Sequence, residues 1–329
     1  MHSLLRGKHF ITDQEWTVEE LNLLFETATE LKRDFALGRP HPLLLYKTLF
    51  MIFFDNSTRT RNSFEAGITQ LGGHAHDLTP DKLQISHGEN AKDTASVLSR
   101  YGHAIAIRHC AYQEGNKYIR EVAQYSKIPV LNMQCDIYHP CQVLADLMTI
   151  RERFGTNTRG LKLAVSWTSA PNYVRPLSVP QSLLLLMPRF GIDVTLACPK
   201  EFALMPEVMK QAEENARISG AKLQVTDSME EAFTGADIVI PKSWGPLTVT
   251  QDKKEGIELI KRYPGWRCDS RMMSLANKNA IYMHPLPADR SFEVTDEVID
   301  GPQSVVYDEA ENRLHVQKAL MALVMGGRP

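Results

Sequence analysis

The feature that most constrains the fold is an alternation of short apolar runs with amphipathic stretches along the whole chain. The segment Thr48–Phe54 is apolar except at its first residue, which is typical of a strand buried on both faces of a sheet. Before it, Thr17 and Glu20 form a capping-box pattern, which predicts a helix from there to about Leu37. Alternation of this kind predicts mostly parallel sheets covered by helices.

The same alternation predicts further elements in both halves of the chain. The expected strands are 74–78, 104–108, 130–133, 161–167, 193–197, 223–226, 237–240 and 280–283, and the expected helices include 59–71, 91–101, 116–126, 140–154 and 309–325. A chain of 329 residues is too long for one ordinary domain. The predicted fold class is α/β, with two three-layer α/β/α domains at residues 1–152 and 153–307. A C-terminal helix at about 308–326 is expected to pack back on the first domain.

Composition excludes several classes of protein. The chain has 37 Lys and Arg against 39 Asp and Glu, so no global field attracts nucleic acid or an anionic membrane. The five cysteines are scattered without a CxxC pair, which favours reduced thiols. The first residues lack an apolar leader, and no window approaches the roughly 20 apolar residues of a membrane span. We therefore expect a cytoplasmic protein that binds neither nucleic acid nor membrane.

Chemistry is expected at the junctions where parallel strands lead into helices, since ligands of such sheets bind at the carboxyl ends of the strands. After the strand 48–54, a turn with Ser57, Thr58 and Thr60 opens a helix that begins at Arg59. Backbone N–H groups at a helix N-terminus favour an anion, and an arginine fork matches phosphate. The turn predicts phosphate binding, with an ordinary N-cap and solvated basic turn as the alternative.

Other junctions carry weaker signals. In the first half, Arg108 ends a strand and His139 precedes a helix. Taken alone, such an arginine is more often a surface charge, and such a histidine is more often a cap residue. In the second half, the predicted strands are followed by 242–245 (Lys-Ser-Trp-Gly) and 284–287 (His-Pro-Leu-Pro), and the last helix contains Arg313. Trp244 alone is equally typical of core packing. Because one sheet edge gathers such junctions, together they indicate a polar site.

Several motifs are absent. The chain has no GxxxxGK[ST], no GxGxxG after the strand 161–167, no HExxH and no GxSxG. This disfavours a P-loop, a dinucleotide site, a zincin and a hydrolase elbow. The eleven histidines do not fall into metal-ligand spacing, so neither a metal nor a cofactor is expected.

Taken together, the motifs resemble those of the aspartate/ornithine carbamoyltransferase family. The resemblance rests on 57–61 (Ser-Thr-Arg-Thr-Arg), Arg108, 139–142 (His-Pro-Cys-Gln), 284–287 and 312–315 (Asn-Arg-Leu-His), in this order along the chain. It implies transfer of a carbamoyl group from carbamoyl phosphate to an amine, with release of phosphate. It also implies a homotrimer whose active sites lie at subunit interfaces.

The resemblance also assigns roles to residues. The catalytic residues would be Arg59, Arg108 and His139. Carbamoyl phosphate would be bound by Ser57, Thr58, Arg59, Thr60, Gln84, Arg108, His139, Gln142, Pro285, Leu286 and Arg313. Within this set, Gln84 matches a position that reaches the neighbouring subunit's site, and the Leu286 carbonyl would contact the carbamoyl amide or the amine. The acceptor would be bound by Lys242, Ser243, Trp244 and Leu286.

The acceptor stays open at the level of sequence. Ornithine enzymes carry an Asp-x-x-x-Ser-Met-Gly motif where this chain has Lys242 to Gly245. The segment 242–245 and the proline-rich loop 169–180 are similar to the acetylornithine and succinylornithine carbamoyltransferases, whose second domain contains a trefoil knot. This likeness predicts a knot and a small amino-acid-like acceptor with a carboxylate that Lys242 would pair, rather than aspartate or ornithine.

Three alternatives remain at this stage. One is an ornithine carbamoyltransferase that makes citrulline. A second, from a different class, is a non-catalytic protein that binds carbamoyl phosphate. A third is a nucleotide-dependent oxidoreductase, which the missing glycine fingerprint disfavours.

Overall fold

A computed structural model describes residues 5–326 of the chain. The chain forms two compact units. Unit 1 contains residues up to Ala145 together with the segment from Glu311 onward, and unit 2 contains Asp146–Ala310. The division falls inside two helices, α5 (Pro140–Phe154) and α12 (Val306–Met325).

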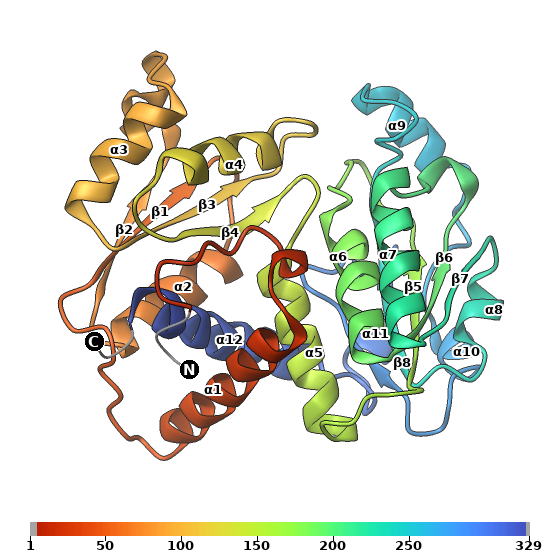
Figure 1. The fold of residues 1–329 in the computed structure, drawn as a ribbon. Helices are drawn as coiled ribbons and strands as arrows, with labels where there is room; N and C mark the ends of the chain where they lie inside the picture. The colour runs from red at the N-terminus through yellow and green to blue at the C-terminus, as the bar shows by residue number, and fades with distance from the viewer. Residues whose placement is uncertain (1–4, 327–329) are drawn as a thin grey trace. The chain divides into compact units, whose positions relative to one another are not determined.

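Unit 1 is built on a four-stranded parallel sheet in the order β2-β1-β3-β4 (Figure 1). Its strands are β1 (Thr48–Phe53), β2 (His74–Leu78), β3 (Ala104–His109) and β4 (Val130–Cys135). Its helices are α1 (Val18–Ala36), α2 (Arg59–Gln70), α3 (Ala91–Tyr101), α4 (Gly115–Tyr125), the start of α5 and most of α12. Short 3-10 turns lie at Asp13–Glu15, Pro80–Lys82 and Gln84–His87.

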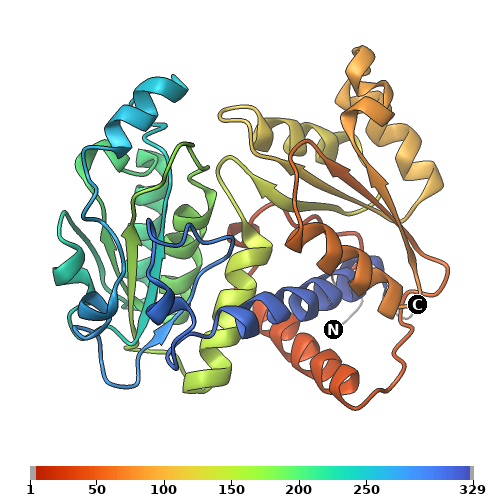
Figure 2. The same ribbon diagram turned by 180° about the vertical axis from the view of Figure 1, so that it is seen from behind.

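The strands of unit 1 are apolar because both faces of the sheet are covered. On β1, Phe50 and Ile52 pack with residues of α3 and α4, whereas the alternate residues Leu49, Met51 and Phe53 are buried on the other side. Helices α3 and α4 cover one face, and α2, α12 and α1 lie on the other (Figure 1). Both views place α12 between α1 and α2 (Figures 1 and 2). This enclosure explains why α12 is buried nearly all round.

Unit 2 is built on a five-stranded parallel sheet in the order β7-β6-β5-β8-β9. Its strands are β5 (Lys162–Trp167), β6 (Asp193–Ala197), β7 (Leu223–Thr226), β8 (Ile238–Lys242) and β9 (Ile281–Tyr282). Its further helices are α6 (Ser178–Leu186), α7 (Pro206–Ser219), α8 (Met229–Phe233), α9 (Lys253–Ile260), α10 (Ser270–Met273) and α11 (Asp296–Ile299). Short 3-10 turns lie at Met187–Phe190 and Lys200–Phe202.

One core cluster of unit 2 lies against one face of this sheet, where side chains of α8, α10 and α11 pack on β5, β6, β8 and β9. The strand order places β5, β8 and β9 side by side. Their carboxyl ends therefore lead into adjacent loops, at Thr168, Ser243 and Met283.

The two parallel-sheet α/β units agree with the predicted fold class. The predicted strands all occur, with ends that differ by at most two residues. The predicted capping box is present: the Thr17 hydroxyl accepts a hydrogen bond from the Glu20 amide, and the Glu20 carboxylate accepts one from the Thr17 amide. No helix among residues 5–326 is long and apolar enough to cross a membrane.

Candidate functional site

The first cluster of predicted site residues lies at the carboxyl edge of the sheet in unit 1. Strands β1, β3 and β4 are adjacent, and Phe53 is paired with Arg108, which is itself paired with Gln134. The register of β3 against β4 shifts between Ile107 and Arg108. Such an irregularity at the end of a ladder re-aims the side chain next to it, and here that side chain is Arg108.

The turn after β1 has the local structure of a helix start. The Ser57 hydroxyl accepts a hydrogen bond from the Thr60 amide at 3.2 Å, and α2 begins at Arg59. Thr60 is buried, whereas Thr58 is exposed. The phosphate-binding pattern predicted at this turn therefore lies at the N-terminus of a helix, where backbone N–H groups and the helix dipole favour an anion.

Two buried or half-buried carboxylates hold the neighbouring loops in place. Asp55, after β1, accepts a hydrogen bond from the Cys110 amide after β3 at 2.7 Å. Asp136, after β4, accepts hydrogen bonds from the amides of Gln113 at 2.9 Å and Asn116 at 2.7 Å. These contacts join the three loops. Sequence reasoning did not single out either aspartate, because an aspartate in a loop has no distinguishing pattern until its partners are known.

Arg313 completes this cluster from a distant part of the chain. Its guanidinium donates to the Gln142 side-chain oxygen at 2.9 Å and to the Thr60 hydroxyl at 2.6 Å. Arg313 is 2% exposed, and both partners are as deeply buried. The arginine of α12 thereby links the first turn of α2 to the first turn of α5. The structure thus brings together four of the predicted positions, Thr60, His139, Gln142 and Arg313.

His139 lies in a strongly positive environment. The backbone carbonyl of His139 accepts a hydrogen bond from the Gln142 amide at 3.0 Å, and the His139 side chain is buried. Burial, together with the positive charges of Arg313, Arg108 and Arg59, holds the pKa of His139 well below its usual range. The imidazole is therefore neutral near pH 7. A neutral imidazole can donate a hydrogen bond to an oxygen that gains negative charge, without itself repelling the neighbouring arginines.

Gln84 is separate from this cluster in the described chain. It begins the 3-10 turn Gln84–His87 and is exposed. No hydrogen bond of its side chain to another residue is found within residues 5–326.

The second cluster lies at the carboxyl edge of the sheet in unit 2 and is centred on Glu293. One carboxylate oxygen of Glu293 accepts from the Lys242 ammonium at 2.5 Å and from the Ser243 amide at 2.7 Å. The other accepts from the Asp289 amide at 2.7 Å and lies 3.3 Å from Nε2 of His284. Glu293 and His284 are buried completely, and Lys242 is 5% exposed.

The charges of this cluster shift one another. Burial lowers the pKa of Lys242 to about 8, against the attraction of Glu293, which raises it. Burial raises the pKa of Glu293, but the attraction of Lys242 and His284 outweighs burial and leaves that pKa well below its usual range. Nearby, Arg175 of the loop after β5 donates to Asp289 at 3.0 Å and to the Tyr173 hydroxyl at 2.7 Å.

His284 holds the backbone of the predicted contact residue Leu286. The Leu286 amide donates to Nδ1 of His284 at 2.9 Å, so the hydrogen of the neutral ring is on Nε2, which faces Glu293. Burial lowers the pKa of His284, which favours this neutral form. Leu286 has φ of 49°, a conformation that costs a non-glycine residue roughly 1–2 kcal/mol. Pro285 is buried, and Leu286 is half-buried.

Two of the residues predicted to bind the acceptor already have partners within unit 2. The Trp244 indole is 1% exposed, and its N–H donates to the Phe202 carbonyl at 2.7 Å. Its carbonyl accepts from the Trp167 indole at 2.8 Å. The Trp244 side chain is therefore part of the core of unit 2. The Lys242 ammonium is already paired with Glu293, so an acceptor carboxylate would not meet an unpaired cation there.

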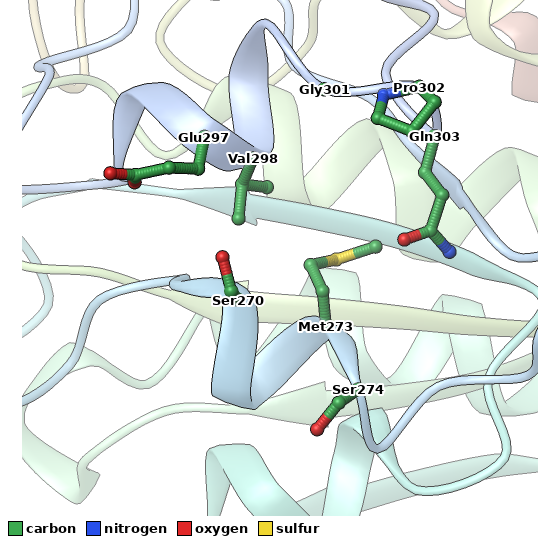
Figure 3. A pocket seen from close by; sticks show the side chains of 8 residues that line it. All are labelled: Ser270, Met273, Ser274, Glu297, Val298, Gly301, Pro302 and Gln303. Carbon is green, nitrogen blue, oxygen red and sulfur yellow. The ribbon is translucent and has the colours of Figure 1, made fainter.

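A separate pocket in unit 2 contains none of the predicted site residues. It has a volume of about 280 Å³ and lies between α10 and α11 (Figure 3). Its lining residues are Ser270, Met273, Ser274, Glu297, Val298, Gly301, Pro302 and Gln303. Among residues 5–326, no group of three or more His, Cys, Asp or Glu side chains is placed to hold a metal ion.

Comparison with known protein families gives two matches that together cover most of the chain. Residues 8–152 match the carbamoyl-P binding domain of aspartate/ornithine carbamoyltransferases. Residues 176–324 match the Asp/Orn binding domain of the same family.

Proteins that are similar over their whole length are also carbamoyltransferases. The ornithine carbamoyltransferases of Caldicellulosiruptor saccharolyticus and Halalkalibacterium halodurans are each 42% identical, over 98% of this chain and 99% and 97% of theirs. The solved ornithine carbamoyltransferase of Pyrococcus furiosus is 40% identical with a TM-score of 0.89, and 99% of each chain is covered. An acetylornithine transcarbamylase solved with acetylcitrulline is 36% identical with a TM-score of 0.90, covering 98% of this chain and all of that one.

Proposed function

The chain belongs to the aspartate/ornithine carbamoyltransferase family, and we propose that unit 1 binds carbamoyl phosphate while residues of unit 2 bind a small amino-acid-like acceptor. The protein is a carbamoyltransferase. Transfer moves the carbamoyl group to the amine of the acceptor and releases phosphate.

The observation that carries the donor site is the set of arginines around His139. These arginines are Arg313, Arg108 and Arg59, and all three are close enough to lower the pKa of this buried ring. Without an anion, such a concentration of positive charge is costly. A dianionic phosphate would offset that cost, with the α2 N-terminus, Ser57, Thr58 and Thr60 as further donors. Phosphate binding thus gives a reason for the arrangement that a solvated basic turn does not.

The chemistry of transfer needs a polarised carbamoyl group and an uncharged amine. The amine nitrogen attacks the carbamoyl carbon, the C=O oxygen gains negative charge, and the C–O bond to phosphate then breaks. The neutral His139 would donate to that oxygen, and Arg108 would stabilise its charge. The departing phosphate takes the proton of the amine, which requires no separate protein base. Holding both reactants in place contributes much of the remaining acceleration.

The acceptor is proposed to be an amino-acid-like amine other than aspartate. The position where ornithine enzymes have an aspartate is Lys242, and its pairing with Glu293 makes this corner of unit 2 different from theirs. The Leu286 carbonyl is proposed to contact the carbamoyl amide or the attacking amine. The similar acetylornithine transcarbamylase was solved with acetylcitrulline, and a mutant of N-acetyl-L-ornithine transcarbamylase was solved with carbamyl phosphate and N-succinyl-L-norvaline. These ligands support a substituted amino acid as the acceptor.

Ornithine is a second candidate, because relatives at 40–42% identity are named ornithine carbamoyltransferases. A panel of amines at saturating carbamoyl phosphate decides between them, with ureido product and phosphate measured together. The panel contains ornithine, aspartate, N-acetylornithine, N-succinylornithine and short diamino acids. Rapid turnover of ornithine alone would establish citrulline formation. Tight binding of carbamoyl phosphate without turnover of any amine would indicate a non-catalytic binding protein.

The assembly is proposed to be a homotrimer in the cytoplasm. The exposed Gln84 is proposed to reach the site of a neighbouring subunit. Five free cysteines fit a reducing compartment. Sedimentation equilibrium tests the trimer. Mixing Gln84→Ala subunits with Arg59→Ala subunits tests the shared site, because only a shared site lets inactive parents regain activity as hybrids.

A trefoil knot in unit 2 is proposed from the close approach of two segments. The Gly245 amide donates to the Arg175 carbonyl at 3.0 Å, and a Cβ at Gly245 would lie 2.0 Å from a methyl of Val174. The chain after β8 therefore passes directly against the proline-rich loop 169–180, as threading through that loop requires. A crystallographic trace of residues 165–260 tests the crossing order.

A further inference from the structure

The structure assigns Glu293 a role that sequence comparison did not suggest: we infer that it is the positioning residue that orders the acceptor-binding loops of unit 2. The inference rests on the proposed function, since the loops in question are those of the proposed acceptor residues. It concerns only the interior of unit 2.

The first ground is connectivity. Glu293 lies outside the motifs 242–245 and 284–287. Its carboxylate nevertheless accepts hydrogen bonds from the Lys242 side chain and the Ser243 amide of the loop after β8. It also accepts one from the Asp289 amide of the loop after β9. Its own backbone carbonyl accepts from the Cys268 amide at 2.9 Å. One side chain thereby fixes both loops to each other.

The second ground is the state of His284. Nδ1 of this ring accepts from the Leu286 amide, so Nε2 carries the hydrogen and faces the Glu293 carboxylate at 3.3 Å. The carboxylate stabilises this tautomer, and the tautomer in turn holds the Leu286 backbone in its left-handed conformation. Glu293 therefore acts on the Leu286 carbonyl through His284, without touching a substrate.

The third ground is the donor capacity of Lys242. An ammonium has three hydrogens, of which one goes to Glu293 and one to the Ser243 hydroxyl at 3.2 Å. Within residues 5–326, no third partner is found, so one N–H is left for a polar group of the acceptor. Glu293 sets the direction of that hydrogen by accepting one of the other two and by fixing Ser243 through its backbone amide.

The charge state of Lys242 depends on the same carboxylate. The charged groups around the lysine are Glu293, Arg175 and Asp289, and the neutral His284 lies beside Glu293. Glu293 favours the protonated lysine and Arg175 disfavours it. Removing the Glu293 charge leaves burial and Arg175 to lower the lysine pKa further below about 8. Activity that needs the ammonium is then lost at a lower pH than in the wild type.

The test compares Glu293→Gln with wild type in steady-state transfer, from pH 6 to 9. We expect at least a tenfold rise in KM for the acceptor, a fall in kcat, and an alkaline limb displaced by one pH unit or more to lower pH. The Kd of carbamoyl phosphate should stay within twofold, since its proposed residues in unit 1 are unchanged. Glu293→Asp, which keeps the charge, should restore part of the pH profile.

The matched control is Asp237→Asn. Asp237 also accepts backbone and side-chain N–H groups, from Lys162 at 2.9 Å and Asn277 at 2.6 Å, but it precedes β8 at the opposite end of the strand. Its replacement should leave acceptor KM and the pH profile unchanged. Kinetics of Glu293→Gln equal to those of the wild type would overturn the inference. A rise in the Kd of carbamoyl phosphate as large as the rise in acceptor KM would also overturn it.

A second readout does not depend on turnover. Nitrogen-15 NMR of the histidine rings reports which nitrogen of His284 carries the hydrogen. We expect an Nε2–H ring in the wild type and in Glu293→Asp, and a change of tautomer or a mixture in Glu293→Gln. If Glu293→Gln does not fold, Glu293→Asp decides through kinetics, because the shorter side chain cannot reach Lys242, Ser243, Asp289 and His284 together. An acceptor KM equal to that of the wild type would then contradict the role of the carboxylate. If the wild type makes no ureido product, the proposed function is wrong. The NMR measurement then still tests whether Glu293 sets the tautomer of His284.

Discussion

Replacement of Arg313 by methionine isolates the contribution of one buried charge to the donor site. Methionine keeps most of the apolar volume but removes the guanidinium that donates to Thr60 and Gln142. A cation roughly 5 Å from a unit anion, at an effective dielectric constant of about 20, contributes ~3 kcal/mol before compensation by the surroundings. Allowing for that compensation, we expect carbamoyl phosphate to bind about 1.4–2.8 kcal/mol more weakly, which is a 10- to 100-fold rise in Kd.

The variant should also change the titration of His139. Arg313 is the first of the three arginines that lower the pKa of this ring, so its removal moves that pKa back toward the ordinary range. Isothermal titration of carbamoyl phosphate between pH 5.5 and 8 measures both effects, after urea unfolding has shown that the variant is folded. Arg153→Met is the control, because Arg153 is half exposed and pairs with Asp308, far along α5 from the proposed donor residues. A folded Arg313→Met protein with Kd within threefold of wild type would refute the reasoning.

Three further predictions follow from the same geometry. His139→Asn should lower kcat at least tenfold and leave the Kd of carbamoyl phosphate within fivefold, because the ring is proposed to donate to the oxygen that gains charge during transfer; steady-state kinetics with unchanged kcat would contradict this. Gly115→Ala should destabilise the protein by at least about 2 kcal/mol, since a Cβ there would lie 1.8 Å from the His109 carbonyl oxygen; a loss below about 0.5 kcal/mol in urea unfolding would be inconsistent with that contact. Finally, the pKa values of His139 and His284 are lowered by burial in the folded state, so the unfolded chain binds protons below about pH 6.5 that the folded chain does not. The free energy of unfolding should therefore fall between pH 7 and pH 5, and an unchanged value in urea titrations at the two pH values would argue against neutral buried rings.

Local patterns determined most of the fold. Strand β1 was predictable because a run of apolar residues has few other places in a protein than the middle of a parallel sheet. Helix α1 was predictable because the capping box of Thr17 and Glu20 acts over a single turn. The helix start at Ser57 to Thr60 was predictable for the same reason, since a helix start and its hydroxyl residues are neighbours in sequence.

The long-range contacts could not be derived from such patterns. Arg313 reaches Thr60 across 253 positions and Gln142 across 171, and no periodicity specifies such a meeting. Only a family resemblance indicated it. The burial of Trp244 in the core of unit 2 could not be decided from the sequence, because a tryptophan beside a motif is compatible with either a binding surface or a core.

The chain's sequence by itself determined two parallel-sheet α/β units and indicated the residues proposed for the donor site. Only the tertiary structure decided the electrostatic state of those residues. Burial and the charges that folding brings close determine whether His139 is neutral and whether Lys242 is already paired. Glu293 is the clearest example. A single glutamate in a loop predicts no role from sequence, because its partners Lys242, His284 and two backbone amides are brought to it only by the fold.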